Sequence, residues 1–229
     1  MNITNAVLKT SKLKELNDFY KKTLSFTLQD ETANSFKIQL GISTIEFTNK
    51  NVKGNPYYHF ACDIPSNQFH EAKEWIQRRI NLLTEDGEDE IYFTNLHAKS
   101  LYFEDPAGNI FEWIARMNDN PTSSQPFSLN NIQKLSEMSL VVSNKIAIAE
   151  SLKDFHIISR DNAEVTANSL SFMGDQKTKV YLLLTNPGRR WLFSNKKSVV
   201  FPLDIRLDAS IILGVDETNE FYIRKILNE

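Results

Sequence analysis

The stretch SLYFEDPAGNIFEWIAR, residues 100–116, contains two apolar segments joined by a sharp turn. The turn residues Asp, Pro, Gly and Asn between residues 105 and 109 separate large hydrophobic side chains on either side, so the pattern predicts two antiparallel strands. One carboxylate, Glu112, lies inside the second apolar segment. A carboxylate in such surroundings is costly unless it is paired, protonated, bound to a metal ion or in contact with water.

The segments around this stretch follow an order that occurs twice. The sequence pattern predicts a strand, a helix and three strands over residues 3–49, and the same order again over residues 57–116. The last strand of each copy, TIEFTN and IFEWIA, places a glutamate between large hydrophobic residues. Glu46 in the first copy therefore corresponds to Glu112 in the second.

A third unit follows a linker. Residues 119–133 are rich in Pro, Ser, Asn and Gln, which is typical of a connecting segment. Residues 134–229 then begin in the same way, with EMSLVV as a strand and KIAIAESLKDF as a helix. The corresponding last strand, KVYLLLTN, has no glutamate, so we expect this unit to support the fold rather than to complete a site. The predicted domains are residues 1–118 and residues 134–229.

The strands of the first two units could direct polar side chains toward a common cleft. Side chains alternate between the two faces of a strand. If the two units pair around one cavity, Asn5, Glu46, His59 and Glu112 share its inward face. The predicted fold class is α+β, with paired βαβββ modules that form a curved mixed sheet around a cleft and a third related βαβββ-like unit.

Three segments resemble the vicinal oxygen chelate superfamily, which includes glyoxalase I, extradiol dioxygenases and bleomycin-binding proteins. They are LNDFYKKTLSF (16–26), the strand and helix from YYHFACDI to WIQRR, and above all YFEDPAGNIFEW (102–113). The resemblance covers about residues 1–116 and implies the paired-module fold. It specifies activity much less closely, because this scaffold supports many chemistries.

The resemblance also implies a metal site at the start of the first strand and in the last strand of each module. These positions carry Asn5, Glu46, His59 and Glu112, where many members have histidine in place of Asn5. Iron-dependent ring cleavage normally uses two histidines and one carboxylate, so a site with one histidine disfavours an extradiol dioxygenase. An oxygen-rich set suits Zn, Ni, Mn or Mg and implies a glyoxalase-like lyase or isomerase, with Glu46 or Glu112 as the catalytic base.

A second hypothesis from the same resemblance is a metal-free protein that sequesters a small molecule, as bleomycin-binding members do. Either function has a small molecule as its partner. The two could be separated by substituting Glu112, which should abolish activity in an enzyme, or by substituting aromatic cleft residues, which should weaken a binding protein. The third unit should either pack on its own chain or mediate a homodimer, since sheet edges need covering.

Composition excludes several other classes. The 229 residues carry a formal net charge of -3, which gives no electrostatic reason to expect nucleic acid as a partner. The single cysteine, Cys62, rules out an intramolecular disulfide and any multi-cysteine metal site. No apolar stretch approaches the roughly 20 residues of a membrane span, and no signal-peptide pattern is present. We therefore expect a cytoplasmic protein without membrane association.

Overall fold

The computed structural model describes residues 1–208 and 210–226. Its helical segments are α1 (Leu13–Asp18), the π-helical turn η1 (Phe19–Thr23), α2 (Phe69–Gln77), α3 (Lys145–Lys153) and the 3-10 turns η2 (Thr94–Leu96), η3 (Leu129–Asn131) and η4 (Arg160–Asn162). Its strands are β1 (Ile3–Lys9), β2 (Leu28–Gln29), β3 (Ser35–Leu40), β4 (Ser43–Thr48), β5 (His59–Asp63), β6 (Ile91–Phe93), β7 (Ala98–Glu104), β8 (Ile110–Arg116), β9 (Lys134–Val141), β10 (Ile158–Ser159), β11 (Ser171–Asp175), β12 (Val180–Thr185), β13 (Leu203–Leu207), β14 (Ile211–Val215) and β15 (Phe221–Lys225). Among the described helices, none is both long and apolar enough to cross a membrane.

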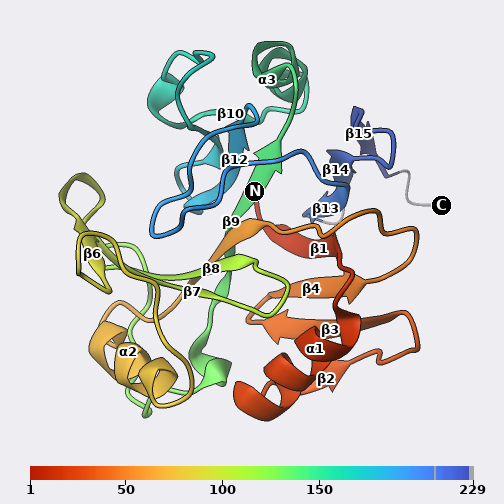
Figure 1. The fold of residues 1–229 in the computed structure, drawn as a ribbon. Coiled ribbons are helices and arrows are strands. Elements are labelled where there is room, and N and C mark those ends of the chain that lie inside the picture. Colours follow the sequence, from red (N-terminus) through yellow and green to blue (C-terminus); the bar gives the residue numbers. More distant parts are fainter. Residues whose placement is uncertain (209, 227–229) are drawn as a thin grey trace.

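The strands form two sheets (Figure 1). One has eight strands in the order β10-β11-β12-β9-β5-β8-β7-β6, and the other has seven in the order β15-β14-β13-β1-β4-β3-β2. Three successive units have the strand, helix, three-strand order, which confirms the predicted α+β fold of βαβββ modules. The last three strands, β13 to β15, form an antiparallel meander without a helix.

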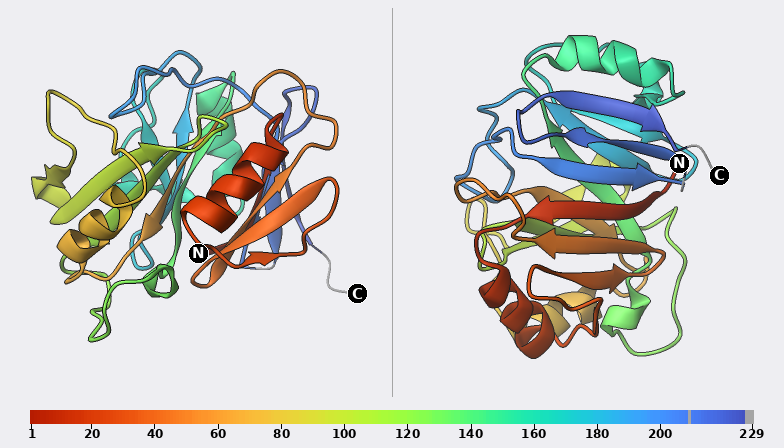
Figure 2. Two further views of the ribbon diagram at one scale, coloured as in Figure 1. Left: turned by 60° about the horizontal axis from the view of Figure 1, so that its bottom comes forward. Right: turned by 90° about the vertical axis from the view of Figure 1, so that its right-hand side faces the viewer.

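The pairing of the units differs from the expectation. In the eight-stranded sheet β5 pairs antiparallel with β9, so the second unit is joined to the third. In the seven-stranded sheet β1 lies between β4 and β13, so the first unit is joined to the C-terminal meander (Figure 2, right). The third unit therefore packs on its own chain. The prediction that the first and second units share one inward face is wrong, and residues 134–229 contribute strands to both sheets.

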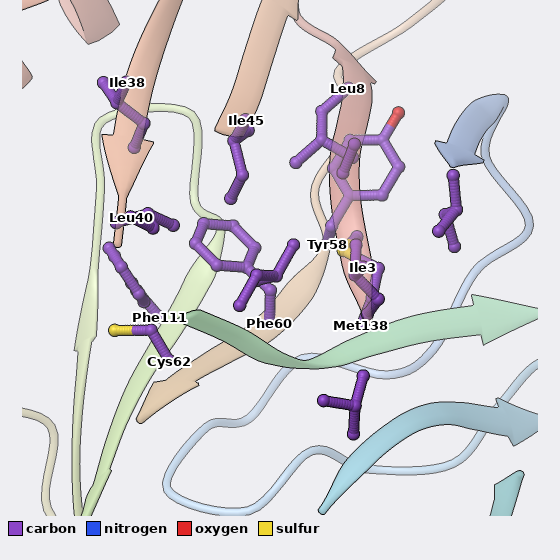
Figure 3. Packing of buried hydrophobic residues seen from close by; sticks show 14 of the residues in the cluster. Ile3, Leu8, Ile38, Leu40, Ile45, Tyr58, Phe60, Cys62, Phe111 and Met138 are labelled. Carbon is purple, nitrogen blue, oxygen red and sulfur yellow. The ribbon is translucent and has the colours of Figure 1, made fainter. Parts of the chain in front are cut away.

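The core lies between the two sheets. Apolar residues of the seven-stranded sheet, such as Ile45 and Leu8, face Phe60 and Met138 of the eight-stranded sheet (Figure 3). The buried residues of the helices, including Leu16, belong to the same cluster. Because side chains alternate along each strand, the residues between these apolar positions point to the opposite face of each sheet, away from the core.

The two sheets are fixed to each other near the start of β9. The Ser43 hydroxyl on β4 donates a hydrogen bond to the Ile3 carbonyl (2.6 Å) and accepts one from the Leu135 amide (3.0 Å). Gly41 has φ +59 and lies so close to Gln133 that a Cβ would fall 1.9 Å from its carbonyl oxygen. Glycine is required at this contact for both reasons.

Candidate metal centre

The DPAGN turn sets the alignment of β8 against β5. The Asp105 carboxylate accepts hydrogen bonds from the amides of Ala107 and Asn109 (both 3.0 Å), and Gly108 adopts φ +87. The Asn109 side-chain oxygen then accepts a hydrogen bond from the buried Tyr58 amide at 2.9 Å. This bond places the residue before His59 beside the start of β8. The turn that resembles the superfamily motif thus has a structural role that brings His59 near Glu112.

His59 is held so that one of its two ring nitrogens is available as a metal ligand. Its Nδ1 lies 3.1 Å from the Ile110 carbonyl oxygen, and its Nε2 lies 3.5 Å from Glu112 Oε2. Burial lowers the pKa of His59, which favours the uncharged ring. A carbonyl that accepts from Nδ1 leaves the Nε2 lone pair free, which is the usual arrangement of a metal-binding histidine.

Glu112 is a buried carboxyl group beside a second acidic side chain. Its exposed fraction is 3%. Desolvation raises its pKa to about 8, and the negative charge of Glu137 adds to this effect, while the hydroxyls of Ser100 and Tyr102 oppose it. Without a cation, Glu112 therefore holds a proton near neutral pH.

Glu137, on β9, completes the cluster. One donor atom from each of His59, Glu112 and Glu137 lies within 4.8 Å of the other two. Glu137 Oε1 accepts a hydrogen bond from Arg116 Nη2 at 2.6 Å, and Arg116 Nε donates to Asp63 Oδ1 at 3.2 Å. Arg116 is 2% exposed. This buried arginine fixes the position of Glu137.

The cluster lies in a cavity of ≈ 930 Å³ on the face of the eight-stranded sheet that points away from the core. Much of the lining comes from aromatic and aliphatic side chains, including Tyr102, Phe172, Leu183 and Trp191. The Trp191 ring centroid lies 5.0 Å from that of His59. A cavity of this size, with apolar walls and a few convergent polar groups, is typical of a small-molecule site.

The strand register relates the two halves of this sheet. In the antiparallel pairing of β5 and β9, His59 lies opposite Ser139 and Ala61 lies opposite Glu137. His59 on β5 and Glu137 on β9 therefore occupy equivalent positions in the two paired strands. Ala61 pairs with Glu112 across β5 and β8, and Ser139 pairs with Leu183 across β9 and β12. The fourth equivalent position therefore carries leucine.

The expected residues Asn5 and Glu46 lie in the other sheet. Val7 pairs with Glu46 as Ala61 pairs with Glu112, so the expected correspondence between the two units holds within each sheet. Asn5 Oδ1 accepts a hydrogen bond from Thr44, and Glu46 lies 3.9 Å from Lys37 Nζ. The expectation that Asn5 and Glu46 contribute to one site with His59 and Glu112 is wrong, because the two pairs belong to different sheets.

The donor set of the cluster fits a divalent cation. One imidazole nitrogen and two carboxylates are ligands suited to Zn, Ni or Mn, and the carboxylates suit Mg. In the described part of the chain, Arg116 forms ion pairs with Glu137 and Asp63, whereas Glu112 is paired only with the imidazole of His59. A dication would supply the missing positive charge and would leave coordination positions open toward the cavity.

The expectation that the third unit only supports the fold overlooks Glu137, because that expectation rests on the last strand of the unit alone. Glu137 is the first letter of EMSLVV, at the position that His59 has in its own unit. Comparing the first strands of all three units would have identified it. Trp191 carried no such signal, since it comes from the irregular segment between β12 and β13.

One family model and several solved structures are similar to parts of this chain. Residues 135–189 match the family model described as toxoflavin-degrading enzyme, which is less than half of the chain. No protein with curated annotation matches. A lactoylglutathione lyase from Agrobacterium tumefaciens is 19% identical with a TM-score of 0.39, over 48% of this chain and 90% of its own. A glyoxalase/bleomycin resistance protein/dioxygenase from Nocardioides is 18% identical with a TM-score of 0.42, over 55% and 89%.

An integron cassette protein from the mobile metagenome of the Halifax Harbour sewage outfall is 17% identical, with a TM-score of 0.42, over 50% of this chain and 97% of its own.

Proposed function

We propose that the protein is a divalent-metal-dependent enzyme that acts on a small oxygenated molecule in the cavity of the eight-stranded sheet. The observation that carries this proposal is the convergence of His59, Glu112 and Glu137 at the floor of a ≈ 930 Å³ cavity. A purely structural role for three buried polar groups would leave two carboxyl groups close together, of which Glu137 alone has an arginine partner among the described residues, and this is an unfavourable arrangement.

All three residues would hold the cation, His59 through Nε2 and Glu137 through the oxygen that Arg116 does not occupy, and Glu112 would have a second role. A divalent ion in this position would polarise a carbonyl or enediolate oxygen of the substrate. Glu112 lacks an arginine partner of its own and would move a proton at the adjacent carbon. The wall formed by Tyr102 and Trp191 would exclude water from the reacting atoms.

Glu112 is a better candidate for the base than the other two acidic residues. Glu46 belongs to the other sheet, and Glu137 is held by a 2.6 Å bond from Arg116. A carboxyl group whose pKa is near neutral can both accept and return a proton. This reasoning selects a lyase or isomerase reaction over ring cleavage, because the cluster has one histidine among its three donors.

The metal-free binding hypothesis has its own support in the apolar lining. Leu183 replaces a donor at the fourth equivalent position, and aromatic rings surround much of the cavity. The partial match to the toxoflavin-degrading enzyme model adds ring compounds to the substrates that an enzyme in this cavity could accept.

Metal binding followed by a substrate screen tests the proposal. Protein stripped with EDTA would be titrated with Mn, Zn, Ni and Mg by calorimetry, and loaded protein would then be incubated with small carbonyl compounds, their thiol adducts and hydroxylated rings. We expect one equivalent of metal and turnover that is lost in Glu112→Gln. Absence of binding for all four ions, combined with tight uptake of an aromatic compound, would favour the binding protein.

A further inference from the structure

The apolar part of the cavity wall includes Leu183, which occupies the fourth equivalent position of the sheet in place of a possible metal ligand. Leu183 is 1% exposed and pairs with Phe172 in the neighbouring strand β11, so both side chains lie on the cavity face of the sheet. Trp191 lines the same cavity next to His59. These flat and aliphatic groups favour a ligand with a planar apolar part beside the candidate metal centre.

Positive charge accumulates at the same side. Arg160 and Arg189 both line the cavity. The Arg160 guanidinium lies 4.2 Å from the Phe172 ring centroid, which fixes it against the aromatic wall.

Arg189 differs from its neighbours on the segment between β12 and β13. Arg190 forms an ion pair with Glu85, and Lys196 pairs with Glu104 at 2.7 Å. The Arg189 side chain has no ion pair or hydrogen bond with any residue that the structure describes; the hydrogen bonds of Arg189 are made by its backbone. Among the described residues, the only acidic side chain paired with Arg160 is the exposed Asp161, at 3.7 Å. Within this part of the chain, the two arginines at the cavity therefore lack a buried acidic partner.

We propose that the substrate is a planar, conjugated molecule with a negatively charged substituent. Its oxygen atoms face His59, Glu112 and Glu137, its ring lies against Leu183, Phe172 and Trp191, and its anionic group binds Arg189 and Arg160. This inference rests on the proposed function and names the substrate class of the same cavity.

A matched pair of probes tests the charge requirement. Catechol and 3,4-dihydroxybenzoate share a ring with two adjacent oxygens, and only the second has a carboxylate. Binding of each to Mn-loaded protein would be measured by calorimetry and by quenching of tryptophan fluorescence. We expect 3,4-dihydroxybenzoate to bind at least about tenfold more tightly, because a charge-assisted contact with arginine contributes on that scale.

The variants separate the two arginines from general effects of surface charge. Arg189→Gln and Arg160→Gln should each reduce the preference for the carboxylate about tenfold, and Arg189→Lys should retain part of it. Arg206→Gln, which removes an exposed arginine from β13 in the other sheet, should leave it unchanged. Trp191→Leu should weaken both probes equally, because both have the same ring.

Two failures are distinguishable. If wild-type protein takes up no metal, the proposed function fails and the probes are then compared on the metal-free protein. If metal binds with one equivalent, and the two probes bind equally or the Arg189→Gln variant keeps the full preference, the anionic substrate class is overturned while the metal site stands.

Discussion

Leu183 occupies, in the third unit, the position that Glu112 occupies in the second. Glu112 pairs with Ala61, two residues after His59, and Leu183 pairs with Ser139, two residues after Glu137. The sheet thus has four equivalent positions, three with donor side chains and one without. Around a bound cation, this asymmetry would leave coordination positions open, with an apolar surface beside them.

Introducing a donor at the fourth position should strengthen metal binding. In Leu183→His the new imidazole would complete a set of four protein ligands, so affinity for Zn should rise about tenfold or more, and access of substrate to the metal should fall. Calorimetric titration with Zn checks this, with Leu183→Ala as the control for lost volume. Equal affinities in Leu183→His and Leu183→Ala would show that this position does not face the cation.

The stability of the metal-free protein should fall as pH rises. The pKa of Glu112 is raised from 4.5 to about 8, so the folded chain holds a proton that the unfolded chain releases. The resulting stabilisation is fully present below about pH 4.5 and is lost as pH rises through about 8. Urea unfolding with EDTA at pH 6 and pH 8.5 measures the loss.

Glu112→Gln serves as the reference in that experiment, because glutamine stays neutral at both pH values. Asp105, whose pKa is raised to about 6, contributes to both proteins and cancels in the comparison. Wild type should therefore lose more stability than the variant between the two pH values. Identical losses would contradict the assignment of a raised pKa to Glu112.

Removing Arg116 should destabilise the fold strongly. Arg116→Met leaves the buried carboxylates of Asp63 and Glu137 without their shared cation, and loss of one partner of a buried ion pair costs about 3–5 kcal/mol. Urea unfolding measures the change. Adding Glu137→Gln to Arg116→Met should recover part of the loss, since one uncompensated charge disappears. Arg206→Met, at an exposed position, should change stability by less than about 0.5 kcal/mol.

The DPAGN turn should affect the metal centre from a distance. Asn109→Ala leaves the buried Tyr58 amide without its acceptor, which costs about 1–3 kcal/mol and loosens β8 against β5. Metal affinity should fall with stability, because His59 and Glu112 belong to those two strands. Asn51→Ala, an exposed asparagine whose side chain bonds Glu217, is the matched control. Unchanged metal affinity in a destabilised Asn109→Ala would separate the turn from the site.

Local patterns were enough to predict the units. Helical spacing, strand alternation and the turn residues identified three βαβββ segments, and the correspondence of Glu46 with Glu112 holds in the strand register. Each of these features depends on residues close together in the chain. His59 and Glu112 were found together for the same reason, since both lie within the second unit.

The pairing between units could not be read from local patterns. The first strands have similar alternation, so nothing in β1 or β5 indicates which strand from another part of the chain will pair with it. The choice of β9 for β5 depends on long-range packing and on contacts such as Ser43 with Leu135. Because that choice was missed, Asn5 and Glu46 were grouped with the wrong partners and Glu137 was left out.

The most direct test of the metal centre compares two equivalent glutamates. Wild type, Glu112→Gln and Glu46→Gln would each be stripped with EDTA and titrated with Mn and Zn by calorimetry, with thermal melting before and after loading. We expect wild type and Glu46→Gln each to bind one equivalent of metal, with a matching rise in melting temperature, and Glu112→Gln to lose both effects severely. Metal binding that survives in Glu112→Gln but is lost in Glu46→Gln would contradict this expectation.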